Sequence, residues 1–225
     1  RHRTLTFVAI AFNPLFIIEG PVSGHNDLIM MAMLAAAAHA LAIHRQRLGF
    51  LLVGLSVAVK LVTALAIPWL LIRAWQDRRN SPARSRAMAV VGLGTIALGS
   101  LLACYIPFLQ TDSLLGGLGD HLARQARKPL ADALIEKTPF LLCFAAATWW
   151  LIRQRRPGAW HDAWVGTSLC LILFGAGIWF PWYLTWPLAL SLTRWDRPGW
   201  IASAVLLSLS AFLMLLYGFF PPGAR

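Results

Sequence analysis

Long apolar runs follow one another along this chain and constrain its fold more than any other feature. Apolar residues make up 58% of the 225 residues, charged residues make up 13%, and the mean hydropathy is +0.64. Soluble domains hold about 25% charged residues, so this composition excludes a water-soluble globule. A helix crosses a bilayer in about 20 residues, and the runs therefore predict an all-α, polytopic integral membrane protein with about seven or eight membrane helices. The runs cover residues 5–18, 28–43, 50–72, 87–109, 140–152, 163–180, 183–192 and 200–220.

The basic residues lie in short clusters between these runs. The chain has 20 Lys and Arg against 9 Asp and Glu, which gives a net charge of +11. Such clusters are typical of cytoplasmic loops, so we expect the lipid bilayer, and no nucleic acid, as a partner. If run 50–72 crosses the membrane once, neither side is enriched in basic residues. If it turns back near Lys60, nearly all clusters share the cytoplasmic side. The positive-inside rule favours this second arrangement, with short or broken helices at 50–72 and 181–193.

A polar cluster separates the first two apolar runs. Asn13-Pro14 would end or kink a helix, and Asn26 or Asp27 could cap the next one. A cap needs one polar side chain, whereas this stretch also places Glu19 and His25 at the expected outer face. A carboxylate and an imidazole there suit hydrogen-bonding a polyhydroxyl substrate or orienting a phosphate. Glu19, His25, Asn26 and Asp27 are therefore candidate binding residues, with the structural interpretation still open.

A single lysine interrupts an apolar run. Lys60 stands in the middle of 50–72, where a charged side chain costs about 2.5–3.5 kcal/mol on insertion scales. It could snorkel to the surface, or it could pair with a carboxylate for structural reasons. Alternatively, its ammonium group binds a phosphate that is attached to a lipid tail. The nearby Gly54 and Ser56 would permit close helix approach.

An aromatic segment separates two of the later runs. It reads Phe180-Pro181-Trp182-Tyr183, and aromatic residues of this kind form belts at membrane interfaces. The alternative is a platform for a sugar ring or an isoprenoid chain, which makes Trp182 and Tyr183 further candidate binding residues. The composition does not separate these two interpretations.

The remaining features fit a single transmembrane helical domain over 1–225. Residues 110–138 predict an outer amphipathic loop within that domain, with leucines at near-helical spacing. The three cysteines fall inside apolar runs, and we interpret them as small core residues. No zinc spacing, phosphate-binding loop or dinucleotide motif is present in the sequence, so no metal ligand and no cofactor is predicted. The cysteines are Cys104, Cys143 and Cys170.

The order of the polar motifs resembles a known enzyme family. The chain is similar to the polyprenol-phosphate-mannose-dependent mannosyltransferases of glycosyltransferase family 87, within the GT-C superfamily of integral membrane enzymes. The similarity is best over 11–73 and continues weakly to 180–186. The residues that carry it are Asn13-Pro14-Leu15, Glu19, Gly24-His25-Asn26-Asp27, Gly54 to Lys60, Pro68-Trp69-Leu70-Leu71 and Trp182-Tyr183.

The resemblance implies a multi-pass enzyme of the cell membrane that transfers a hexose, with mannose as the expected sugar. The donor would be a polyprenyl-phosphate sugar and the acceptor a glycan or glycolipid on the outer face, without a nucleotide. Lys60 would contact the donor phosphate, and the other candidates would line the site. The acidic catalytic base of this superfamily is then expected upstream of Arg1, which would make the chain the C-terminal part of a larger domain. The alternative function is a transporter or flippase for a lipid-linked or polar solute, although the sequence shows no internal repeat typical of transporters.

Overall fold

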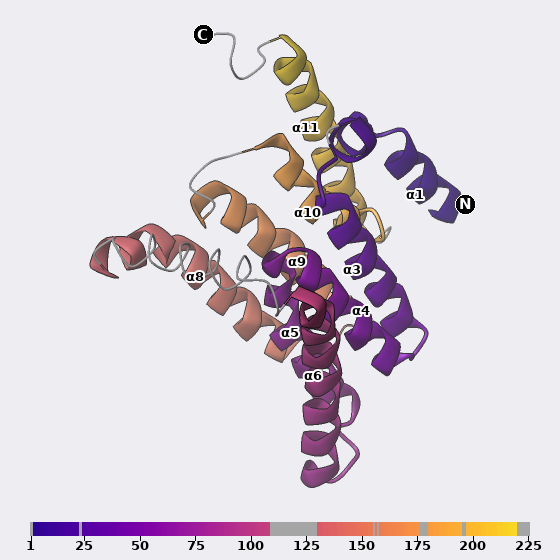
Figure 1. Ribbon diagram of the computed structural model, residues 1–225, viewed down its shortest axis with the longest axis vertical. Coiled ribbons are helices and arrows are strands. Elements are labelled where there is room, and N and C mark those ends of the chain that lie inside the picture. Colours follow the sequence, from indigo (N-terminus) through magenta and orange to yellow (C-terminus); the bar gives the residue numbers. More distant parts are fainter. Residues whose placement is uncertain are drawn as a thin grey trace.

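The structure is a computed structural model that describes residues 2–22, 24–108, 130–154, 156, 158–175, 180–194 and 197–219. Over these residues the chain is all-helical and contains no strand, as the apolar runs predict (Figure 1). The elements in the N-terminal half are α1 (His2–Ala11), α2 (Pro14–Ile17), η1 (Ile18–Val22), α3 (Asp27–Ala42), α4 (Gln46–Val59), η2 (Leu61–Leu65), α5 (Ala66–Asp77), α6 (Ala83–Tyr105) and η3 (Ile106–Phe108). Those in the C-terminal half are α8 (Leu130–Arg153), α9 (Ala159–Cys170), η4 (Leu171–Gly175), η5 (Pro181–Leu184), α10 (Thr185–Ser191) and α11 (Arg197–Phe219).

Helix α6 is the one helix in the described ranges that is both long and apolar enough to cross a membrane. Its surface is largely exposed and apolar, with Val91 68% and Leu102 54% exposed, which is how a lipid-facing helix looks. Shorter apolar helices run over Asp27–Ala42, Gln46–Val59 and Gly199–Leu213. The prediction of seven or eight membrane helices is therefore not confirmed. Several of the expected runs are split by prolines or by the break at Lys60, so their pieces fall short of a bilayer thickness.

Helices α3, α4 and α6 pack closely beside one another in the N-terminal half. A Cβ atom at Gly54 of α4 would come within 2.1 Å of the Ala97 carbonyl oxygen on α6, so the missing side chain permits the contact. The Ser100 hydroxyl of α6 donates to the Leu51 carbonyl at 3.1 Å. The Ser56 hydroxyl joins α4 to α3 by donating to the carbonyl of Met30 at 2.8 Å. Gly54 and Ser56 thus have the packing role that the sequence suggested.

Run 50–72 is broken at Lys60, as the charge pattern predicts. Helix α4 ends at Val59, Lys60 is extended with φ −158° and ψ 126°, and η2 and α5 follow. The Arg78 guanidinium after α5 donates to the side-chain oxygen of Gln46, at the start of α4. The chain therefore returns to the end of the fold from which it came, which is the geometry of the re-entrant arrangement. The side of the membrane on which this end lies stays a prediction.

The second expected break, at 181–193, contains the short helices η5 and α10. Helix α10 is central to the C-terminal half, and its Leu188 and Leu190 are fully buried. The Trp164 indole on α9 donates to the carbonyl of Trp186 on α10 at 2.8 Å. Helix α11 lies beside the N-terminal helices (Figure 1), where the Asn13 amide donates to the Ser210 hydroxyl at 3.1 Å. Both halves of the chain thus contribute to one apolar core.

Two further predictions concern the segment after α6 and the cysteines. Residues 109–129 of the expected loop 110–138 lie outside the described residues. Residues 130–138 form the first turns of α8, which contains Pro139. The cysteines are free thiols of intermediate exposure rather than buried core residues. They are Cys104, Cys143 and Cys170.

Candidate functional site

The Lys60 side chain forms an ion pair with a buried carboxylate. Its Nζ lies 2.9 Å from both Oδ1 and Oδ2 of Asp27, and it donates to both. The Asp27 side chain is 1% exposed, whereas that of Lys60 is 31% exposed. The Trp186 indole N–H also donates to Oδ1 of Asp27. The carboxylate is therefore paired inside the protein, whereas part of the Lys60 side chain is accessible.

The break in the helix positions this lysine. Because Lys60 is extended, its side chain leaves the α4 axis and reaches the first residue of α3. The Thr63 hydroxyl donates to the carbonyl of Lys60 at 3.2 Å and satisfies a group that the broken helix leaves open. The Lys60 N–H donates to the Ser56 carbonyl at 3.1 Å. The Thr63 hydroxyl and the last backbone hydrogen bond of α4 thus hold the non-helical Lys60 backbone in place.

The capping interpretation of the polar cluster is wrong for both side chains. Asn26 occupies the position before α3, but its side chain makes no capping hydrogen bond and instead donates to the Val59 carbonyl at 3.5 Å. The Asp27 carboxylate is occupied by Lys60 and Trp186. A negative charge at the first turn of α3 still interacts favourably with the helix dipole. Both side chains thus bond to residues that are distant in the sequence, and a local sequence pattern does not reveal such partners.

Glu19 and His25 form a second charged contact in the connection between α2 and α3. The His25 Nδ1 atom lies 3.1 Å from Oε2 of Glu19, although the N–H direction is not that of a hydrogen bond. Glu19 is 2% exposed, and its burial raises the pKa of the carboxyl above the ordinary value. The charge of His25 acts in the opposite direction, and that of Asp27 raises the pKa further. The Nε2 atom of His25 makes no hydrogen bond to the described residues, so it is available to a ligand.

Aromatic rings connect the two charged contacts. The His25 ring stacks on Trp182 with 4.2 Å between centroids, and Trp182 stacks on Phe180 at the same distance. Tyr183 lies edge-on to Trp182 and packs against Trp186 with centroids 4.6 Å apart. The Lys60 Nζ lies over the Tyr183 and Trp186 rings at 5.4 and 5.3 Å from their centroids, within the range of cation–π attraction.

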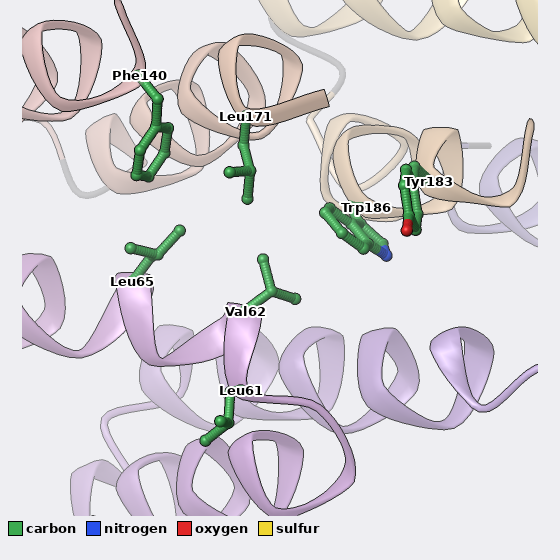
Figure 2. A pocket seen from close by; sticks show the side chains of 7 residues that line it. All are labelled: Leu61, Val62, Leu65, Phe140, Leu171, Tyr183 and Trp186. Atoms are coloured by element: carbon green, nitrogen blue, oxygen red, sulfur yellow. The ribbon is translucent and has the colours of Figure 1, made fainter. Parts of the chain in front are cut away.

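An apolar cavity of about 380 Å³ begins at two of the rings that contact Lys60. Tyr183 and Trp186 form one wall, so the same two rings contact the cation and line the cavity. Figure 2 shows that Val62 and Leu65 from the chain after Lys60 point toward Phe140 and Leu171 across a shared space. The full lining is Leu61, Val62, Leu65, Phe140, Leu171, Tyr183 and Trp186. The site thus combines a fixed cation with an apolar recess.

Most of the residues singled out from the sequence meet in this one place. Six of them form a continuous cluster, while Asn26 turns away to the backbone of Val59. Sequence reasoning missed Trp186 and the apolar lining. Trp186 follows Trp182 by one helical turn, and this spacing is the signal that could have indicated a shared face. The six residues are Glu19, His25, Asp27, Lys60, Trp182 and Tyr183.

Comparison with known proteins points in the same direction. Residues 2–76 match the family model of the alpha-(1->6)-mannopyranosyltransferase N-terminal domain. The match supports a glycosyltransferase enzyme, and more narrowly a mannosyltransferase. It covers both charged contacts, which lie between Glu19 and Lys60. No curated protein and no solved structure matches the chain. In the described ranges, no group of three or more His, Cys, Asp or Glu residues could hold a metal ion.

Proposed function

We propose that this protein is a multi-pass membrane mannosyltransferase that takes mannose from a polyprenyl-phosphate donor. The acceptor is a glycan or glycolipid on the outer face of the membrane. The observation that carries the proposal is that Tyr183 and Trp186 both contact the Lys60 ammonium and line an apolar cavity. A lipid-linked phosphate needs a cation and an apolar surface next to each other, and these two features meet at Tyr183 and Trp186.

Lys60 has the capacity to bind a phosphate while it stays paired with Asp27. An ammonium group has three N–H donors, and two of them point to the Asp27 carboxylate. The third can donate to a phosphate oxygen, on the side where Lys60 is exposed. Asp27 then acts as a positioning residue that fixes the direction of the cation. The Tyr183 and Trp186 rings add cation–π attraction that helps to hold the ammonium group in place.

The cavity suits the first isoprene units of the donor. Its volume of about 380 Å³ falls within the range of pockets that hold small ligands. Leucine, valine and phenylalanine side chains line it, and none of them can hydrogen-bond to a ligand. The rest of a long polyprenyl chain would continue into the bilayer.

The transfer itself places a clear demand on the site. The acceptor oxygen bonds to C1 of mannose, and the bond between C1 and the phosphate oxygen breaks. The bonding electrons leave with polyprenyl phosphate, and the acceptor proton passes to a base. A fixed cation at the phosphate stabilises the charge that develops on this leaving group. The Nε2 of His25, held near Glu19 and stacked on Trp182, can hydrogen-bond a sugar hydroxyl beside it.

A transfer assay with paired variants tests this function. The double variant Lys60→Met/Asp27→Asn removes the cation without leaving a buried charge. Mannose transfer from a synthetic polyprenyl-phosphate-mannose donor in liposomes should fall about 10- to 100-fold, the value of one charge-assisted contact. The matched control is Arg73→Met/Asp77→Asn, which neutralises an ion pair of α5 at 2.9 Å and should keep the parent activity. Equal activity in the two double variants would refute the proposal.

A further inference from the structure

A second cavity lies at the opposite end of α4 from Lys60. Its volume is about 880 Å³, and it is bounded by the turn from α3 to α4, the residue after α5, and the first half of α6. Because α4 rises about 1.5 Å per residue, the helix Gln46–Val59 separates this cavity from the Lys60 site by about 20 Å. The two cavities therefore cannot hold the same phosphate group.

One wall of this cavity is basic and carries no compensating acid. Arg45, Arg47 and Arg78 line it, and no Asp or Glu does. Among the described residues, none of these three arginines forms an ion pair. The Arg78 guanidinium is held in place by the Gln46 side chain and by the Ala74 carbonyl at 3.1 Å. The wall is thus a partly preorganised binding surface for an anion.

The opposite wall is apolar and belongs to α6. Met88, Gly92 and Ile96 lie along it at helical spacing. Met88 is 66% exposed, and a Cβ atom at Gly92 would meet nothing within 4 Å. This wall therefore leaves an open apolar groove that starts beside the arginines and runs along the helix.

The position of the cavity indicates which kind of anion it would meet. It lies at the polar end of α6, the described helix that is long and apolar enough to cross a membrane. At this end the Arg86 guanidinium lies over the Trp75 ring, 4.6 Å from its centroid. Tryptophan and arginine at a helix end are typical of the boundary between water and lipid. Phosphates at this depth are those of phospholipid headgroups.

We propose that this cavity binds an anionic phospholipid, with the headgroup phosphate against Arg45, Arg47 and Arg78. The first part of an acyl chain would lie in the groove at Met88 and Gly92. A zwitterionic lipid has a cationic headgroup that three unpaired arginines would repel, so the site should prefer an anionic one. The proposal does not depend on the sugar-transfer function, because it rests on different residues at the other end of α4.

Native mass spectrometry of the full chain in detergent tests this site. The probes are phosphatidylglycerol, phosphatidylcholine and inorganic phosphate, each titrated against the parent protein and the variants. Each basic contact at a membrane surface contributes about fivefold in affinity. Arg45→Gln/Arg47→Gln should therefore lower the affinity for the first bound phosphatidylglycerol molecule by on the order of 25-fold. The matched control Arg79→Gln/Arg84→Gln removes the same charge from residues that do not line the cavity, and it should change affinity less than about threefold.

A second variant keeps the test decisive if the arginine variant does not fold. Gly92→Trp fills the apolar groove without changing any charge, and it should weaken phosphatidylglycerol binding while inorganic phosphate binding stays as in the parent. An equal loss in the control double variant would mean that only diffuse surface charge attracts the lipid. Equal binding of phosphatidylcholine, or phosphatidylglycerol binding that Gly92→Trp leaves unchanged, would also overturn the proposal.

Discussion

Replacement of Lys60 by Met is predicted to destabilise the protein, although it removes a charge from an apolar run. A lysine without a partner would cost stability, so its loss would be neutral or favourable. Here the loss leaves the Asp27 carboxylate, which is 1% exposed, without its cation. Breaking a buried pair from one side costs about 3–5 kcal/mol. Because Lys60 is 31% exposed, we expect the low end, about 3 kcal/mol.

The double variant Lys60→Met/Asp27→Asn should recover most of this loss. The amide oxygen at position 27 can still accept the hydrogen bond from the Trp186 indole, and no buried charge remains. In a protein of this size, 1 kcal/mol shifts the unfolding temperature by about 2–4 °C. The single variant should therefore unfold about 6–12 °C below the parent, and the double variant within about 4 °C of it.

Tryptophan fluorescence during heating in detergent measures these unfolding temperatures. The ion pair of Arg73 and Asp77, which lie one helical turn apart, provides the control because its carboxylate is 41% exposed. Arg73→Met alone should shift the unfolding temperature by no more than about 2 °C, because an i,i+4 helix pair contributes about 0.3–0.5 kcal/mol and the Asp77 carboxylate that remains is hydrated. If Lys60→Met is as stable as the double variant, the carboxylate is not buried with its cation and the reasoning fails.

Three further predictions follow from the same contacts. Burial raises the pKa of the Glu19 carboxyl above 4.5, so ionising this group costs the folded state more than the unfolded state. As pH rises from about 4.5 to 8, Glu19→Gln should therefore become more stable relative to the parent. Unfolding temperatures of the two proteins that change in parallel with pH would contradict this. Gly54→Ala should lower the free energy of unfolding by about 1–3 kcal/mol, because α6 occupies the space that the new methyl group needs. At Gly94 a Cβ atom would meet nothing within 4 Å, so Gly94→Ala should be neutral or stabilising in the same thermal assay. Single cysteines at Gln46 and Ser81, in a background without the native cysteines, should both resist an impermeant outer reagent, and labelling of one alone would refute the re-entrant arrangement.

The break at Lys60 could be predicted because two features of the sequence indicate it independently. A charged residue in an apolar run and the distribution of arginines both require the chain to turn there. The convergence of Glu19, His25, Asp27 and Lys60 followed from the same reasoning, since polar groups in apolar surroundings need partners. These inferences depend only on which polar and charged side chains need partners, and the sequence shows this directly.

The partners themselves could not be predicted, because they are distant in the sequence. Trp186 donates to Asp27 across 159 residues, and the Asn13 amide reaches Ser210 across 197. Local rules offered Asn26 or Asp27 as a helix cap, and the structure instead places both side chains on distant partners. The number of membrane helices also stays a prediction, since hydropathy counts apolar residues but does not locate the ends of helices.

The most direct test of the account is a structure of the protein in lipid nanodiscs with a non-transferable polyprenyl-phosphate-mannose analogue. Cryo-electron microscopy would locate the phosphate by its density. The account predicts a phosphate oxygen within hydrogen-bonding distance, about 2.7–2.9 Å, of the Lys60 Nζ, with Asp27 still paired behind it. The first isoprene units would contact Leu65 and Phe140. A phosphate bound elsewhere, with the cavity beside Tyr183 and Trp186 unchanged, would contradict the central claim.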